Sequence, residues 1–170
     1  MTKLSGPQIR RLEISDGALF REIRLEALVK SPEAFGSTFE RENAQPLAWF
    51  EATLDRADIF GAFLDGSLAG MAGYSARENS KQAHEGLLWT MYVRAAARNS
   101  GVGKALVAAV LDHARGRVEM VQLTVVSENE GARRLYRAMG FVEYGYEKKA
   151  LKYDGRYYDE VLMVHCLDDH

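Results

Sequence analysis

The sequence is poor in the features that mark secreted proteins, membrane proteins and metal-cluster proteins. Cys166 is its single cysteine, which excludes an internal disulfide and leaves no cysteine cluster to hold a metal. No apolar run approaches the roughly 20 residues that span a bilayer, and the N-terminus lacks an apolar core of signal-peptide length. We therefore expect a cytoplasmic protein that acts without a membrane and without a metal.

Charge of one sign is not in excess either. Lys and Arg number 22 against 24 Asp and Glu, so the formal net charge is −2. This balance gives no general affinity for nucleic acid. The sequence also lacks both common nucleotide-binding loops, the Gly-x-x-x-x-Gly-Lys-Ser/Thr pattern and the Gly-x-Gly-x-x-Gly pattern with an acidic residue on the following strand. We expect no nucleic-acid partner, no nucleoside triphosphate and no dinucleotide.

What is present is the composition of an ordinary globular protein. The chain has 170 residues, of which 47% are apolar and 27% charged, with no repeat, linker or low-complexity segment. We predict one domain over residues 1–170, of the α/β class, built on a single mixed and mostly antiparallel sheet with helices on both faces. Alternation and turn residues predict strands at 8–14, 58–64, 67–77, 86–93, 118–126, 141–150 and 156–165. Asp65-Gly66 and Tyr153-Asp154-Gly155 are the predicted hairpin turns.

Four helices are predicted between these strands. They start near Ser15-Asp16, near Pro46, after Gly101 and at Ser127-x-x-Glu130, a capping-box pattern. The residues expected to face the core are Leu19, Ile23 and Ala27 in the first helix and Leu47, Phe50 and Leu54 in the second.

The stretch from Leu87 to Arg115 organises the chain. An apolar run of strand length leads into Arg98-x-x-Gly101-x-Gly103, and a helical pattern follows at once. Glycines let the backbone approach a ligand closely, and the first amides of a helix have no internal partner. Because Lys104 adds positive charge beside Arg98, the loop predicts an anion site, and phosphate fits it best. Taken alone, the glycines could equally reflect the geometry of the turn.

A second motif follows one helix and one strand later. The sequence Val93-x-x-x-x-Arg98-x-x-Gly101-x-Gly103 is followed by Asn129-x-x-Ala132-x-x-Leu135-Tyr136-x-x-x-Gly140-Phe141. The two motifs in this order closely resemble the GCN5-related N-acetyltransferase (GNAT) family, and the resemblance covers nearly all of the chain. It implies the acyl-CoA N-acyltransferase fold, in which a central pair of parallel strands splays apart around the pantetheine arm of acetyl-CoA.

The resemblance also implies the residues that hold this co-substrate. Pantetheine is expected along the backbone of the strand 86–93, and the pyrophosphate at the amides of the glycine loop. The coenzyme-binding residues expected in this way are Met91, Tyr92, Val93, Arg98, Asn99, Ser100, Gly101, Val102, Gly103, Lys104, Asn129 and Ala132. Asn129 can instead serve its own helix start. Three arginines on that helix, Arg133, Arg134 and Arg137, mark either a solvated face or the site of the coenzyme 3′-phosphate.

Catalytic roles follow from the needs of thioester aminolysis. The amine must be neutral, the oxyanion needs a donor and the leaving thiolate needs a proton. Tyr136 matches the family tyrosine that donates to the coenzyme sulfur, and within the motif this acid role is favoured; without the motif, a core aromatic near a helix end would be the simpler interpretation. A backbone N–H near Met91 is the expected oxyanion donor. Glu85, which shares a strand face with Leu87, is the predicted general base, with His84 as a weaker competitor.

The acceptor is expected between two segments that resemble the family's acceptor walls. One contains Phe35, Phe39 and Glu42, and the other is the tyrosine-rich hairpin around Tyr157 with Asp159 and Glu160. Each of these residues could equally be an ordinary surface or core residue. We expect an acetyl-CoA-dependent N-acetyltransferase that transfers acetyl directly to a primary amine of a small molecule or of a protein. A non-catalytic CoA-binding sensor is the alternative. Family members often dimerise, so a homodimer is a candidate assembly.

Overall fold

A seven-stranded mixed sheet forms the centre of the computed structural model, which describes residues 6–167. The strand order is β1-β2-β3-β4-β5-β7-β6, and every neighbouring pair is antiparallel except β4 and β5. The strands are β1 (Gln8–Arg11), β2 (Asp58–Leu64), β3 (Ser67–Ala76), β4 (Glu85–Val93), β5 (Met120–Val126), β6 (Val142–Tyr153) and β7 (Arg156–Cys166). The predicted mixed sheet with one parallel pair is confirmed. A helix connects β4 to β5, as a parallel pair requires.

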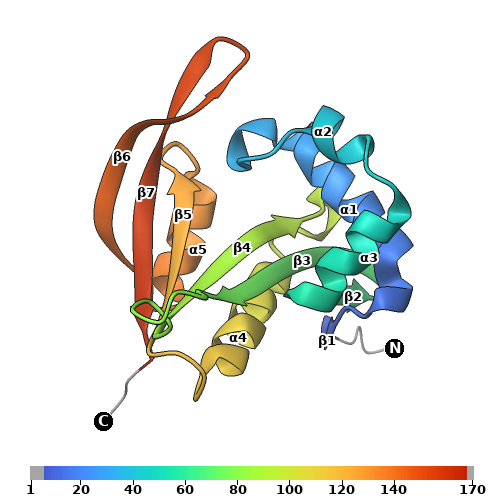
Figure 1. The fold of residues 1–170 in the computed structure, drawn as a ribbon, viewed down its shortest axis with the longest axis horizontal. Helices are drawn as coiled ribbons and strands as arrows, with labels where there is room; N and C mark the ends of the chain where they lie inside the picture. The colour runs from blue at the N-terminus through green and yellow to red at the C-terminus, as the bar shows by residue number, and fades with distance from the viewer. Residues whose placement is uncertain (1–5, 168–170) are drawn as a thin grey trace.

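Helices cover both faces of the sheet (Figure 1). The α-helices are α1 (Gly17–Lys30), α2 (Phe39–Asn43), α3 (Leu47–Arg56), α4 (Val102–Ala114) and α5 (Glu130–Ala138), and the short 3-10 turns are η1 (Ile14–Asp16), η2 (Pro32–Ala34) and η3 (Ala95–Ala97). Within residues 6–167, no helix has the length and apolar character needed to cross a bilayer.

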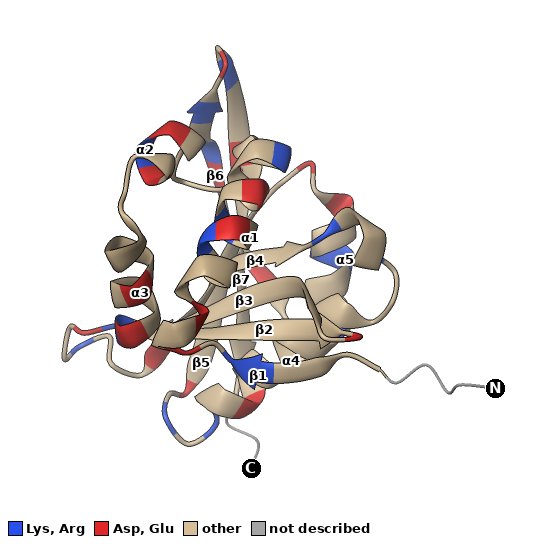
Figure 2. Ribbon diagram, turned by 90° about the vertical axis from the view of Figure 1, so that its right-hand side faces the viewer, with Lys and Arg blue, Asp and Glu red and all other residues tan. Residues whose placement is uncertain are grey.

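Two apolar cores lie on opposite faces of the sheet. Phe20, Ile23 and Phe50 of α1 and α3 are at most 2% exposed and pack in one cluster. Leu106 and Val110 of α4 pack in the other, which also takes in Tyr136 of α5. We call the two sides the α1 face and the α4 face. Acidic and basic positions are interspersed over the side of the molecule that faces the viewer in Figure 2.

The two predicted hairpin turns are present and share one geometry. Asp65 and Gly66 have φ of 49° and 81°, and Asp154 and Gly155 have φ of 49° and 76°. Two consecutive positive φ angles are what a two-residue hairpin turn of type I′ requires, and Asp-Gly adopts them at low cost. Local sequence therefore determines both turns.

Near the N-terminus the structure corrects the prediction. The first strand ends at Arg11 instead of continuing to Ile14, because Asp16 accepts a hydrogen bond from the Glu13 backbone N–H at 2.7 Å and turns the chain. Ile14 is consequently 48% exposed. Leu19 of α1 is 40% exposed and does not face the core as predicted.

The segment between α1 and α3 holds a further helix that no periodic pattern indicated. It is α2, where the Thr38 hydroxyl accepts from the Arg41 backbone N–H at 3.2 Å. Leu47, at the start of α3, is 45% exposed and does not face the core as predicted. In the C-terminal half, β5 begins at Met120, two residues later than predicted, and β6 continues to Tyr153.

Candidate active site

A cavity of about 1360 Å³ opens where β4 and β5 separate. The two strands pair at only three positions, from Glu85 opposite Met120 to Leu87 opposite Gln122. Beyond Leu87 and Gln122 the strands diverge, and residues from both strands line the space between them. The parallel pair is therefore splayed, with its open end toward Val93 and Val126.

The bend in β4 is centred on Thr90. Thr90 has φ of 49° and the β3–β4 register shifts beside it, which together mark a β-bulge. Its effect is visible in the packing: Trp89 and Tyr92 both pack on the α1 face, while Met91 packs on the α4 face. Strict alternation would have put residues 89 and 92 on opposite faces.

An arginine and a glutamate from the α1 face hold the bulge. Arg24 Nη1 donates to Thr90 Oγ1 at 2.8 Å, and Glu42 accepts two bonds of 2.8 Å from Arg24 Nε and Nη2. Burial alone would raise the pKa of Glu42, but the Arg24 guanidinium, with the Ser37 hydroxyl and the charge of Arg41, more than offsets this and holds that pKa below its usual value. Glu42, predicted as part of the acceptor wall, thus serves to fix Arg24.

The predicted anion loop forms the N-terminus of α4. Gly101 occupies the position before the first helical residue with φ of 84°, a conformation that favours glycine. A Cβ built on Gly101 meets nothing within 4 Å, whereas one on Gly103 would lie 3.0 Å from Leu135 Cδ2. The loop residues that line the cavity are Arg98, Asn99, Gly101, Gly103 and Lys104.

Two residues of the loop have a different position. Ser100 donates its hydroxyl to the Ala97 carbonyl, and Val102 is fully buried in the core on the α4 face. Neither is among the residues that line the cavity. On the other side of the loop, Met91, Tyr92 and Val93 of β4 all line it.

Asn129 begins α5 and also lines the cavity. Its side-chain oxygen accepts from the Ala132 backbone N–H at 3.2 Å, so Asn129 caps the helix, and the predicted capping box led by Ser127 is wrong. Asn129 and Ala132 both belong to the lining. The local role and a ligand-facing position are compatible in this geometry.

Tyr136 reaches the cavity from α5. It is 5% exposed and its ring meets Phe141 edge-on, with centroids 5.8 Å apart. Burial raises the pKa of the Tyr136 phenol above its ordinary value. The group therefore stays protonated at neutral pH, as a proton donor must.

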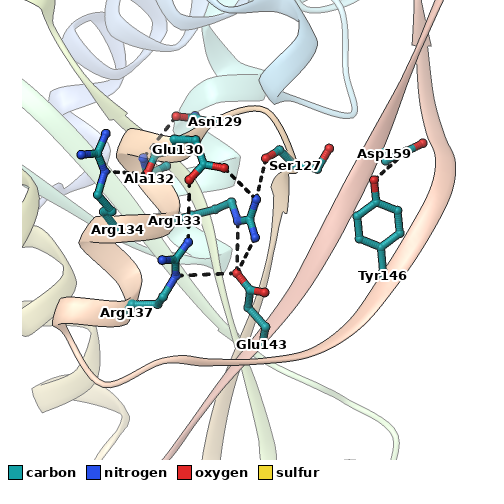
Figure 3. A network of polar contacts seen from close by, with 10 residues as sticks. All are labelled: Ser127, Asn129, Glu130, Ala132, Arg133, Arg134, Arg137, Glu143, Tyr146 and Asp159. Atoms are coloured by element: carbon teal, nitrogen blue, oxygen red, sulfur yellow. Dashed lines mark hydrogen bonds and ion pairs between the residues drawn. The ribbon is translucent and has the colours of Figure 1, made fainter.

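The three arginines of α5 divide into two kinds (Figure 3). Arg133 donates to Glu143 at 2.8 Å and pairs with Glu130 at 3.0 Å, and Arg137 lies within 3.8 Å of the same two carboxylates. Arg134 instead lines the cavity. Only Arg134 among the three is thus placed to meet a ligand phosphate.

Glu85 is not brought to this site. It lies at the closed end of the β4–β5 pair, where Arg77 Nε is 2.8 Å from its carboxylate and His84 Nε2 is 3.6 Å away. Six residues of strand, about 20 Å, separate it from Met91. Neither Glu85 nor His84 lines the cavity. Shared parity with Leu87 therefore identified a residue at the closed end of β4, away from the cavity.

The side of the cavity away from the glycine loop is formed by η2 and by β7. Phe35 lines it beside Glu33, while Phe39 packs against the α1-face core. From the hairpin come Tyr158 and Glu160. These candidates could not be ranked from the sequence. Which of them line the cavity depends on how the β6–β7 hairpin packs relative to η2.

Asp159 and Tyr157 do not reach this wall. Asp159 accepts from the Tyr146 hydroxyl at 2.5 Å and from the Lys149 backbone N–H at 2.8 Å, which joins the two strands of the hairpin (Figure 3). Tyr157 is 47% exposed. Neither residue lines the cavity.

A mixed sheet opened between two parallel strands, with a glycine-bounded helix N-terminus at the opening, is the architecture of coenzyme A-dependent acyl transfer. The profile of the acetyltransferase (GNAT) family matches residues 21–141. The chain belongs to this family.

Individual relatives agree with this assignment. L-amino acid N-acetyltransferase AaaT of Escherichia coli (strain K12) is 26% identical over 160 residues, which are 92% of this chain and 95% of that protein. N-alpha-acetyltransferase RimI of Mycobacterium tuberculosis (strain H37Rv) is 36% identical over 119 residues, 70% of this chain and 68% of that protein. The structure of yncA from Salmonella typhimurium, solved with acetyl-CoA, has a TM-score of 0.82 at 24% identity and covers 98% of this chain and 96% of its own. The protein is an acetyl-CoA-dependent N-acetyltransferase, as the motifs implied.

Proposed function

We propose that the protein transfers acetyl from acetyl-CoA to the α-amino group of an L-amino acid or of a peptide N-terminus. One of the two named relatives is an L-amino acid N-acetyltransferase and the other an N-alpha-acetyltransferase. What those acceptors share is an α-amino group. At a peptide N-terminus this group has an ordinary pKa of about 7.7–8.0, which leaves a useful neutral fraction at physiological pH, unlike the lysine ammonium near 10.4.

One observation carries the proposal: the cavity reaches both faces of the sheet. Arg24 of α1 and Tyr136 of α5 lie on opposite faces, and both line the same space. Its volume of about 1360 Å³ exceeds the roughly 300–1,000 Å³ typical of a single-ligand pocket. We therefore assign acetyl-CoA to the α4 side and the amine to the α1 side, with the thioester in the gap between β4 and β5.

The roles of the lining residues follow from this arrangement. The unpaired edge of β4 from Met91 to Val93 receives the pantetheine arm, with Asn129 opposite. The amides of residues 98–104, with Arg98 and Lys104, hold the pyrophosphate at the positive end of α4. Backbone N–H groups at the bulge next to Met91 stabilise the oxyanion. Tyr136 gives its proton to the leaving sulfur.

Four further proposals concern the chain as a whole. Residues 1–170 form one N-acetyltransferase domain, since β1, β6 and β7 lie outside the matched family range yet complete the same sheet. The protein works in the cytoplasm, which suits its single cysteine. It needs neither nucleic acid nor a membrane. A homodimer remains a candidate that sedimentation can test.

The test of the function is thiol release from acetyl-CoA in the presence of an amine panel, combined with calorimetric titration of acetyl-CoA. The panel contains free L-amino acids, alanine-initiated tripeptides, their N-acetylated counterparts and polyamines. Thiol release with free α-amines, and none with the blocked counterparts, is the expected result. Acetyl-CoA binding without release from any amine would instead support the sensor alternative, for which the relatives give no support.

A further inference from the structure

Glu160 occupies a distinctive place in the wall of the cavity. On β7, Val161 and Met163 are at most 2% exposed in the α4-face core, so Glu160 points to the α1 face. There it lines the cavity and is half-buried. We propose that Glu160 is the catalytic residue that takes the proton from the acceptor ammonium, an inference that rests on the function proposed above.

Thr124 on the neighbouring strand β5 lines the same cavity, and its neutral hydroxyl favours the charged form of the Glu160 carboxylate. No Lys, Arg or His within residues 6–167 lies in ion-pair distance of Glu160. Glu42, Glu85 and Glu128, by contrast, are each paired with an arginine. A carboxylate without a cation partner keeps its capacity to accept a proton.

The surroundings also make Glu160 a stronger base. Burial raises its pKa, Glu147 directly opposite on β6 adds to the rise, and the Thr124 hydroxyl opposes it. The other charged or titratable groups on this side of the cavity are Arg24 on α1, which is paired with Glu42, Glu33 on η2, Tyr158 and Arg156 on β7, and Glu128, which is 2.5 Å from Arg156. A base whose pKa moves toward the working pH is more effective.

The acid and the base then lie on opposite sides of the reacting bond. Glu160 takes one proton from the ammonium on the α1 face, and the free nitrogen forms the C–N bond with the thioester carbon. As the C–S bond breaks, the sulfur receives a proton from Tyr136 on the α4 face. Tyr136 regains a proton as the nitrogen loses its second one. The products are the N-acetyl amide, the coenzyme thiol and one proton released from Glu160.

The direct test is Glu160→Gln, assayed with the free L-amino acid or the tripeptide of the panel that the wild type acetylates best. We expect kcat at pH 7 to fall by about 10²–10⁴, with the acetyl-CoA dissociation constant unchanged. With a tripeptide acceptor the loss should shrink above pH 8, where its α-amine deprotonates without help. Unchanged kcat, or a rise in KM alone, would overturn the proposal.

Two further variants test the base through its pKa and do not depend on the glutamine variant folding. Glu147→Gln removes a negative neighbour, so the acidic limb of kcat/KM should move to lower pH. Thr124→Val removes the hydroxyl that favours the charged form of Glu160, so the acidic limb of kcat/KM should move to higher pH. The assignment would be refuted if the acidic limb did not move in either variant. It would also be refuted if Glu33→Gln lowered kcat more than Glu160→Gln does.

The same experiment separates this inference from the proposed function. If none of the amines tested supports thiol release by the wild type, the proposed function itself fails. If the wild type is active and Glu160→Gln matches it, only the role of Glu160 fails. Glu160→Asp, which keeps a carboxylate, should recover part of the activity.

Discussion

Replacing Tyr136 by phenylalanine removes one oxygen atom from the centre of the proposed site. The ring keeps its edge-on contact with Phe141 at 5.8 Å and its burial at 5% exposure, so the fold should tolerate the change within about 1 kcal/mol. The proton for the leaving sulfur is lost, however. General acid catalysis contributes about 10²–10⁴ in rate, which is about 3–5 kcal/mol of transition-state free energy.

Tyr74→Phe is the matched control for this variant. Tyr74 is 3% exposed in the same α4-face core, is not among the residues that line the cavity, and its hydroxyl has no partner within residues 6–167. Each of the two variants loses one buried phenolic oxygen. We expect Tyr74→Phe to keep full activity and at least wild-type thermal stability, because an unpaired buried hydroxyl is lost.

The assay is pre-steady-state thiol release together with calorimetric binding of acetyl-CoA. Tyr136→Phe should lower kcat by at least about 100-fold while the dissociation constant changes less than about twofold. In the wild type, the raised pKa of Tyr136 predicts no loss of rate from its ionisation up to about pH 10. Equal losses in rate and in coenzyme affinity would show that Tyr136 serves packing or binding, and an unchanged rate would remove it from the mechanism.

Three other changes probe the coenzyme side and the bulge. In Gly101→Glu the new carboxylate would enter the open space at the start of α4, beside the proposed pyrophosphate site. Two like charges about 4 Å apart near a surface repel by about 4 kcal/mol. Acetyl-CoA should therefore bind more than about 100-fold more weakly by calorimetry. Arg134→Gln should weaken acetyl-CoA binding about two- to fivefold at low salt and have little effect at high salt, whereas Arg137→Gln should change nothing. Arg24→Met should cost about 3–5 kcal/mol in urea unfolding because Glu42 is left buried without a partner, and Glu42→Leu added to it should restore most of the loss. The lowered folded-state pKa of Glu42 means that this wild-type stabilisation is complete above about pH 4.3 and is lost as the pH falls through the folded pKa.

Sequence alone gave those parts of the fold that depend on neighbours in the chain. The Asp65-Gly66 turn needs only two consecutive residues that accept positive φ, and the helix after Gly101 needs only its own apolar pattern. The order of β4, α4 and β5 follows from the handedness and length of a parallel connection. These elements were predicted within a few residues.

The parts that could not be predicted join residues far apart in the chain. Arg24 and Thr90 are 66 positions apart, and nothing local to either residue indicates their hydrogen bond. Glu85 shows the same limit in another form: alternation places it on a strand face, but which end of β4 opens depends on where β5 stops pairing. Glu160 could be singled out only once the burial of Val161 and Met163 had set the face of β7.

The splay of β4 from β5 leaves both strands stably attached to the sheet. β5 keeps seven paired positions with β7, and β4 keeps its ladder with β3 on both sides of the bulge. Opening the sheet therefore leaves unpaired only the two inner edges, the edges to which we assign the pantetheine arm. The bulge at Thr90 is held by Arg24, which itself lines the acceptor side of the cavity. Arg24 thus contributes both to the bulge and to the proposed acceptor wall. A substitution of Arg24 that reshapes this wall should therefore also move the backbone donors next to Met91. On this arrangement, acceptor choice and transition-state stabilisation are expected to be coupled.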